Sequence, residues 1–461
     1  MRIMRLTWST LLIAGLLGTV NITVASATNA EILKELEKLK ARIEQLEKKL
    51  AEQEAKNQEQ DKEVSSIKES SDFKELVKIK EALGNVKIGV GATGIVQGTI
   101  KNDENYKRAL DYPRDGEVTD GSYSVDIEIE APVGEHGTAF LHLEAGEGAN
   151  VSDELAGLTG VNADALDDDG DIEVAEAWYE HSFKDDRVLL TVGKLDPVVY
   201  FDTNEVANDE TTQFLADIFV NNIAVDWPDD YAGGFRLTIR PHPLLDINMG
   251  ALEADGDFED IFEDTFGIGE VHFKPKLFGD RQGNYRFYGW INGGDHEKWW
   301  IPRDVRWPYR ILGVEPDDLW RGNYQNRIQD NETGVGFGVS FDQELSDTVT
   351  AFLRFGLQDG DIYEAKYSWS LGGQIRGSLW NRPDDMLGVA YGQAILSSDY
   401  EKFLKHYDIH PGDEGHFEAY YRYQVNDHLA VSPDVQVINN IAGSEKAHTV
   451  TVFGLRGQVD F

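Results

Sequence analysis

Acidic side chains recur at every second position in the segment 122–131. Asp126, Glu128 and Glu130 alternate there with valine and isoleucine. A period of two indicates a β-strand with one polar and one apolar face. A turn at 134–137 predicts a return strand that carries Glu144 on its polar face. Because a row of carboxylates must contact water, a closed sheet of such hairpins would have a wet interior and an apolar exterior, as a bilayer requires.

Arginines occupy the polar faces of the strands predicted later in the chain. The seven candidates are Arg236, Arg240, Arg286, Arg354, Arg376, Arg422 and Arg456. Glu176 and Glu180 extend the acidic set on an earlier strand. Opposite charges across a narrow aqueous space would orient polar solutes, and rings of charge set ion preference. The charges could instead pair with one another and only support the wall, so both interpretations stay open.

The segment 196–232 combines carboxylates and amides with aromatic rings. Its four candidates for solute contact are Asp196, Asp202, Asn204 and Glu205. Amides and carboxylates can bind hydroxyl groups while rings lie against CH faces, so this set could bind a sugar; ordinary loop packing is the alternative. The segment 294–332 is rich in tryptophan and arginine. That mixture suits capture of sugars or anionic groups, and equally lipopolysaccharide contact or subunit packing.

The sequence offers little to support catalysis or metal binding. The run Asp167–Asp171 could attract calcium, but its spacing does not match an EF-hand, and an exposed acidic loop is usually only solvated. Histidines are scattered, and neither a G-x-S-x-G motif nor a Walker loop is present. We therefore expect no enzyme activity, no cofactor and no metal.

The amino-terminal region is predicted to be separate from the sheet. Residues 1–27 have the basic start, apolar run and small-residue end of a secretory signal peptide. Residues 28–56 carry apolar side chains in four-three spacing, which predicts a periplasmic coiled coil and a homo-oligomer, with a trimer favoured over a dimer. A single amphipathic helix is the alternative. Residues 57–85 are interpreted as a linker and a short helix.

The rest of the chain, residues 86–461, predicts an all-β fold of about sixteen antiparallel strands. Short and long connections alternate along it without a break, as in a barrel with short periplasmic turns and long outer loops. Different division of the segment 196–232 would add a pair of strands. The chain has 83 acidic and 43 basic residues, no cysteine and a formal charge of −40. Scarce basic residues argue against nucleic-acid binding, and the composition suits a bacterial outer membrane, although a secreted halophilic or calcium-binding protein would also be acidic.

The final strand has the clearest alternation. Phe453, Leu455 and Phe461 lie on one face, and Arg456 and Gln458 on the other. A terminal aromatic residue on an amphipathic strand looks like the signal by which the barrel-assembly machinery recognises its substrates. We therefore expect Phe461 to serve in assembly.

Several stretches of the chain resemble the carbohydrate-selective porins of the OprB family. The resemblance rests on GVGFGVSFDQELSDTVTAFLRFGLQDGD (334–361), WNRPDDMLGVAYGQAILSSDYEKF (380–403), EAYYRYQVNDHLAVSPDVQVI (418–438), GLRGQVDF (454–461) and, earlier, the segment 192–222. It implies a sixteen-stranded outer-membrane porin that passes sugars by diffusion, with the segment 196–232 folded inward to narrow the pore. The coiled coil, the acidity and the tryptophan-rich loop depart from the family's common form.

The hypothesis from the sequence is therefore a passive channel for carbohydrates and similar small polar solutes. Two alternatives remain: a general ion-selective porin, and an envelope-tethering protein anchored by the coiled coil. We expect weak ion selectivity despite the acidity, because salt screens exposed loop charges beyond about 8 Å while arginines inside the lumen are screened less. The expected partners are sugars, outer-membrane lipid, the assembly machinery and further copies of the chain.

Overall fold

A computed structural model describes residues 84–100, 117–148, 151–155, 157–165, 170–228, 231–256, 258, 264–296, 298 and 332–461. The predicted signal peptide, coiled coil, linker helix and most of the tryptophan-rich loop lie outside the described residues. The strands are β1 (Lys87–Ile100), β2 (Thr119–Val133), β3 (Gly137–Gly148), β4 (Glu173–Phe183), β5 (Val188–Leu195), β6 (Ala232–His242), β7 (Leu245–Glu253), β8 (Thr265–Phe273), β9 (Lys276–Leu277), β10 (Arg281–His296), β11 (Glu332–Glu344), β12 (Val349–Gln358), β13 (Ala365–Arg376), β14 (Met386–Leu396), β15 (Glu414–Asn426), β16 (Leu429–Asn439) and β17 (Val450–Asp460).

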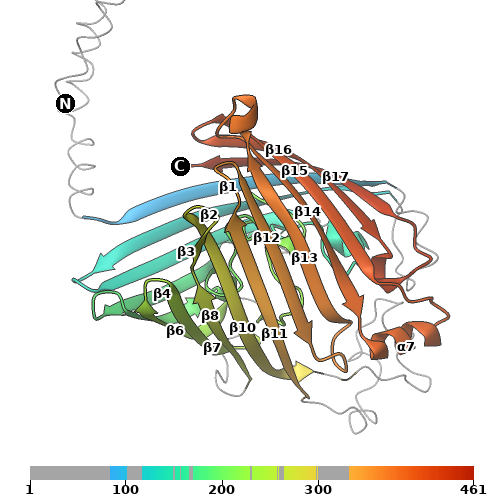
Figure 1. The fold of residues 1–461 in the computed structure, drawn as a ribbon, viewed down its shortest axis with the longest axis horizontal. Helices are drawn as coiled ribbons and strands as arrows, with labels where there is room; N and C mark the ends of the chain where they lie inside the picture. The colour runs from blue at the N-terminus through green and yellow to red at the C-terminus, as the bar shows by residue number, and fades with distance from the viewer. Residues whose placement is uncertain are drawn as a thin grey trace, which may run out of the picture. The chain divides into compact units, whose positions relative to one another are not determined.

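The strands form one closed antiparallel sheet (Figure 1). Each long strand pairs with the next, β8 pairs with β10, and β9 is a two-residue strand in the turn between them. Closure comes from β1, which pairs with both β2 and β17, with Gly91 opposite Asp460. The terminal Phe461 extends this seam, because its backbone N–H donates to the carbonyl of Val90 at 2.9 Å. Without β9, sixteen strands close the barrel, as predicted, and no edge is left unpaired.

Short turns join the strands at one end of the barrel and long connections at the other, as predicted. The tightest hairpin turns follow β6 at 243–244 and β15 at 427–428. The turn after β4 holds Lys184, Asp185 and Asp186 at positive φ, between 53° and 62°. Most of these turns contain few residues, so the register of each hairpin is fixed by local geometry.

Side chains alternate between the lumen and the outside along each strand. On β17, Leu455 is 53% exposed on the outside, whereas Arg456 is 1% exposed on the inside. Leucine, valine and phenylalanine predominate among the exposed large side chains of the outer face. The period of two therefore places the apolar surface where lipid can cover it.

Short helices occur only in the connections among the described residues. They are α4 (Val151–Leu155), η1 (Pro197–Val199), α5 (Asp217–Val220), η3 (Gly377–Trp380), α7 (Ser398–His406) and η4 (Ile441–Gly443). None of the helices in the described part of the chain is long and apolar enough to cross a membrane.

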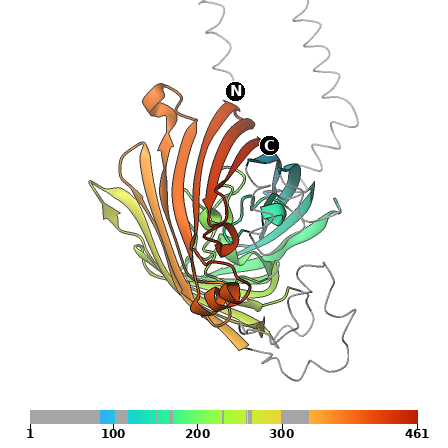
Figure 2. The ribbon, with the colours of Figure 1, turned by 90° about the vertical axis from the view of Figure 1, so that its right-hand side faces the viewer.

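Residues 196–228, here called the inner loop, lie inside the ring of strands (Figure 2). The loop has its own apolar contacts with the wall. Phe201 belongs to a buried cluster with Tyr288 and Trp290 of β10, and Phe214 lies 5.7 Å from Phe352 of β12 between ring centroids. Burial of these rings removes apolar area from water at about 25 cal/mol per Å². The loop is thus a packed layer inside the barrel, as the resemblance implied.

Two glycines of β11 make room for this layer. Gly336 and Gly338 face the lumen opposite β10, and a Cβ at these positions would lie 2.4 Å from Trp290 and 2.3 Å from Tyr288, respectively. Both rings can lie flat on the strand because no side chain stands there.

Residues 151–165, here called the second loop, also reach the inner wall. Val151 and Val161 are buried with Ile438, Val450 and Val452. Gln436 of β16 donates to the carbonyl of Val161 at 2.9 Å. Two outer loops therefore cover part of the lumen side of the barrel.

Candidate functional site: the inner wall and the inner loop

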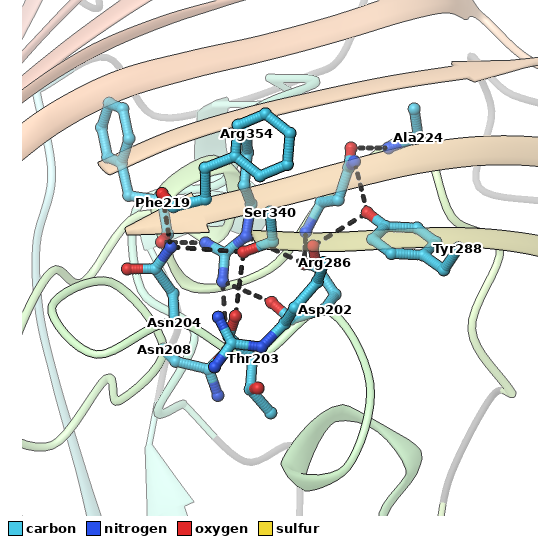
Figure 3. Close-up of polar contacts among 12 residues, drawn as sticks. Asp202, Thr203, Asn204, Asn208, Phe219, Ala224, Arg286, Tyr288, Ser340 and Arg354 are labelled. Atoms are coloured by element: carbon cyan, nitrogen blue, oxygen red, sulfur yellow. Dashed lines mark hydrogen bonds and ion pairs between the residues drawn. The ribbon is translucent and has the colours of Figure 1, made fainter. Parts of the chain in front are cut away.

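The inner loop is attached to the wall through the guanidinium of Arg354 on β12 (Figure 3). Its Nε lies 2.9 Å from Oδ2 of Asp202. Its Nη1 donates to the carbonyl of Phe219 at 2.7 Å, and Nη2 donates to the carbonyl of Asp202 at 2.9 Å. Arg354 is 1% exposed. A buried charge is tolerated only when it is paired and hydrogen-bonded, and here the loop supplies every partner named.

Asp202 is the residue of the inner loop that forms the ion pair with Arg354. Its Oδ1 accepts a hydrogen bond from the hydroxyl of Tyr288 at 2.8 Å, and its Oδ2 accepts one from the backbone N–H of Asn222 at 2.8 Å. The residue adopts φ of 57°, a left-handed conformation that is uncommon for any residue except glycine. The contacts to Arg354, Tyr288 and Asn222 hold that conformation in place.

A second ion pair lies beside the first on the neighbouring strands. Nη1 of Arg286 on β10 is 2.9 Å from Oδ2 of Asp342 on β11, and both side chains are buried. Asn204 of the inner loop donates to Oγ of Ser340 at 3.2 Å, and the N–H of Glu205 donates to Asp342 at 3.4 Å. The loop therefore follows β10 and β11 closely over residues 202–205.

Residues 213–216, in the middle of the inner loop, are attached to β15 and β17. Nη2 of Arg456 donates to the carbonyl of Gln213 at 2.8 Å, and Arg456 is 1% exposed. The two carboxylate oxygens of Glu418 accept the N–H groups of Leu215 and Ala216 at 2.7 and 3.0 Å. Glu414 binds the second loop in the same manner, since it accepts the N–H of Thr159 at 3.0 Å.

The contacts that attach the two loops to the wall follow one chemical pattern. Wall arginines donate to loop carbonyls, and wall carboxylates accept loop N–H groups, so the charged side chains satisfy irregular backbone that would otherwise be buried without partners. Asp342, Glu414 and Glu418 were not among the residues predicted from the sequence, although Glu418 has the inward parity of a strand and could have been found by that signal.

This arrangement changes the role of several predicted pore residues. Arg286, Arg354 and Arg456 face inward as predicted, but they lie beneath the inner loop rather than on a surface that contacts solvent. Asp202 and Asn204 are also buried against the wall. Arg354, Arg456, Asp202 and Asn204 have polar atoms engaged in loop-to-wall bonds, whereas Arg286 pairs with Asp342 of the neighbouring strand. Direct solute contact stays a prediction for the other candidates.

The predicted acids of β2 and β3 remain in contact with solvent. The Asp126 side chain is 24% exposed and its Oδ1 lies 2.9 Å from Nε2 of His142. Glu128 is exposed. Glu130 pairs with Lys87 at 2.7 Å, and Glu144 accepts a hydrogen bond from the hydroxyl of Tyr231 at 2.9 Å.

The remaining arginines are distributed along the lumen. Arg236 on β6 is buried, lies 3.4 Å from Glu180, and has its guanidinium carbon 4.3 Å from the centre of the Tyr200 ring. Arg240 and Arg376 are exposed near the short-turn end of the barrel. Arg422 is half-buried and donates from Nη2 to Gln458 at 3.3 Å. Arg236 is thus buried like Arg286, Arg354 and Arg456, whereas Arg240, Arg376 and Arg422 keep exposed surface.

Asp196 and Glu205 keep part of their surface accessible. Asp196 caps η1 by accepting the N–H of Val198 at 2.9 Å, and its own N–H donates to Glu176 at 3.1 Å. Burial raises the pKa of Asp196 to about 7, and the negative charges of Glu176 and Glu144 raise it in the same direction. Burial also raises the pKa of Glu205.

No group of three or more histidine, cysteine or acidic residues among those described could hold a metal ion. Asp167, Asp168 and Asp169 lie outside the described residues, so the calcium question raised by the sequence stays a prediction.

Part of the chain is similar in sequence to a known protein. An uncharacterised protein of Aquifex aeolicus is 36% identical over 82 residues, which cover 18% of this chain and 26% of that protein. The chain therefore matches about a quarter of that relative's length.

Solved structures of similar fold include OprB from Pseudomonas putida. Its high-pH structure has a TM-score of 0.67 and 16% identity over 82% of this chain and 94% of that one. Its low-pH structure has a TM-score of 0.50 and 13% identity, covering 85% and 98% of the two chains. At these identities the likeness shows the barrel fold.

The family model of the carbohydrate-selective porins matches residues 117–461. That range contains β2 to β17, both inward-folded loops and every wall residue that anchors them. The chain thus belongs to the OprB family of carbohydrate-selective porins.

Proposed function

We propose that this protein is an outer-membrane porin through which carbohydrates and similar small polar solutes diffuse passively. The observation that carries the proposal is the pair of opposite faces on one closed sheet: an apolar exterior, and an interior of ionised and hydrogen-bonding side chains narrowed by the inner loop.

The inner loop supports the proposal by its fixed position. A loop held by Arg354, Arg456 and Glu418 keeps one pore cross-section, whereas a loosely attached loop would fluctuate. Its half-buried Tyr200 and Asp196, and the neighbouring Trp178 of β4, combine rings with hydrogen-bonding groups. A sugar presents CH faces and hydroxyls, which such a combination can contact in passing.

Reconstitution tests the function directly. Liposomes containing the folded full chain should swell in iso-osmotic solutions of hexoses, faster than liposomes prepared with the heat-denatured chain. A particle that folds and inserts but passes neither hexose nor salt would refute the proposal and favour the envelope-tethering alternative.

We also propose the cellular context expected from the sequence: signal-directed export, assembly through Phe461, and a periplasmic coiled coil at residues 28–56 that makes the porin a homo-oligomer. The stacking of Phe461 on His428, with ring centroids 5.3 Å apart, is compatible with an ordered terminal residue. Polar replacement of Leu39 and Leu46 should weaken association and leave the barrel folded. The mass of the detergent-solubilised particle tests this, and a one-chain mass before mutation would contradict the oligomer.

A further inference from the structure

The inner loop hides basic side chains and leaves acidic ones near the solute. Arg354 and Arg456 have their guanidinium groups bonded to loop atoms and are almost without exposed surface. On the other part of the wall, Asp126 and Glu128 contact solvent. A passing solute therefore meets a different charge from the one that a list of inward side chains suggests.

Five carboxylates converge on this part of the lumen from three parts of the chain. They are Asp126 and Glu144 on the wall, Asp164 of the second loop, and Asp196 and Glu210 of the inner loop, here called the acidic face. Asp126 and Glu144 are opposite each other in the β2–β3 pairing. Asp164 reaches the wall through its Oδ1, which accepts the hydroxyl of Ser124 at 3.0 Å.

The carboxylates of the loops and of the wall lie close enough for their charges to act on one another. The charges of Asp126 and Glu144 act on Asp164, and those of Glu144 and Glu176 act on Asp196. Asp164 and Asp196 in turn act on Glu210. The two loops and the wall therefore enclose one region of negative potential, which low-dielectric surroundings strengthen.

Basic groups near the acidic face are engaged elsewhere or in part. His142 contacts Asp126 at 2.9 Å, Arg236 lies 3.4 Å from Glu180, and Nζ of Lys194 lies 5.8 Å from the centre of the Tyr231 ring. Arg456 also lowers the pKa of Asp164 through its charge, but its Nη groups bond to loop carbonyls. The local balance remains acidic.

An unpartnered atom indicates what this region lacks. Asp164 is 6% exposed, and its Oδ2 is buried without a hydrogen-bond partner. A buried carboxylate oxygen with no donor is costly unless a donor or a cation reaches it. The Asp164 side chain lies beside Ser124 and feels the negative charges of Asp126 and Glu144. The missing partner of its Oδ2 would therefore be a positively charged group or a donor that this acidic region attracts.

We propose that the acidic face is a cation-selecting stretch of the permeation path, which favours solutes carrying a protonated amine over neutral solutes and excludes anionic solutes of the same size. This inference rests on the proposed porin function and specifies its substrate class. An ammonium group could pair with Asp126, Glu144 and Asp196, which keep exposed surface, while the buried Asp164 adds to the negative potential.

Planar bilayers containing the full chain test the inference at pH 8, where Asp164 and Asp196, whose pKa values are raised to about 7, are largely ionised. The reversal potential in a KCl gradient should show potassium preferred over chloride by about fivefold or more, as one unit charge near the path suffices for that ratio. Liposome swelling at this pH should rank N-methylglucamine, whose secondary aliphatic amine stays protonated, above sorbitol, and sorbitol above gluconate. Replacement of three acids, D126N/E144Q/D164N, should bring the ion ratio close to one and remove the N-methylglucamine advantage.

Glu135→Gln is the matched control, because Glu135 is exposed in the turn of the same hairpin and its neutralisation should change neither readout. If the triple variant does not fold, the single variants Asp126→Asn and Glu210→Gln carry the test. Normal glucose flux with a wild-type ion ratio near one, or with chloride preferred, would overturn the inference and leave the porin function standing. Absence of both ion conductance and glucose flux would overturn both.

Discussion

The two sides of the inner wall carry opposite charge but do different work. On the side of β10, β12 and β17, arginines are buried: Arg354 and Arg456 bond to the inner loop, and Arg286 pairs with Asp342 of β11. On the side of β2 and β3, carboxylates face solvent. The difference teaches that a charged side chain inside a barrel can either hold a loop in place or contact the solute. Burial of the side chain separates these two roles, whereas the sign of its charge and its inward direction on the strand do not.

The largest expected effect comes from breaking the anchor on the covered side. Arg354→Ala leaves the buried carboxylate of Asp202 unpaired, and loss of one partner of such a pair destabilises by about 3–5 kcal/mol. Denaturant titration of the barrel should show this loss, and single-channel conductance should become larger and noisier as the inner loop loosens.

Arg422→Ala is the control from the solvent-contacting part of the wall, because Arg422 is half-buried and bonds to glutamine side chains. It should leave stability nearly unchanged and move the reversal potential towards cations. Equal destabilisation by the two variants would mean that the inner wall does not divide into scaffold and path.

The next largest effect should come from filling the space that a glycine of β11 leaves for an aromatic ring, on the side of the wall that the inner loop covers. Gly338→Ala places a Cβ 2.3 Å from the Tyr288 ring, and overpacking of this kind costs about 1–3 kcal/mol. Because Tyr288 also donates to Asp202, the inner loop should shift as well.

Gly269→Ala on β8 is the matched control for Gly338→Ala, since a Cβ there has no atom within 4 Å. Thermal unfolding in detergent compares the two variants. Equal melting temperatures would show that the slot adapts and that the ring does not fix the loop.

The smallest expected effect is a pH dependence of the selectivity on the acidic face. Burial raises the pKa of Asp164 to about 7 and that of Glu210 to about 8, and Asp196 also titrates near 7. Raised carboxyl pKa values mean that these acids are largely neutral at pH 6 and ionised above pH 8. The preference for cations should therefore fall as the pH is lowered from 8.5 to 6.

Protonation of the nearby His142 would act in the same direction on acidification. Reversal potentials measured across this pH range provide the check. In the triple variant D126N/E144Q/D164N the slope should be smaller, and an unchanged slope would place the titrating groups outside the acidic face.

The sequence by itself determined the sheet. A period of two fixes which side chains share a face, and the alternation of short and long connections fixes how many hairpins close the ring, because both depend on residues adjacent along the chain. The outward position of Leu455 and the inward position of Arg456 followed from their parity.

Only the tertiary structure decided which inward charges a solute can meet. Arg354 bonds to Asp202 across 152 positions of the chain, and Arg456 to Gln213 across 243. No local pattern encodes such a pairing, since alternation gives the direction of a side chain but not what covers it. Burial by the inner loop turned two arginines, Arg354 and Arg456, into anchors and left the carboxylates of β2 and β3 in contact with solvent. The reason is that an irregular loop inside a barrel must satisfy its backbone with the charged groups that it buries.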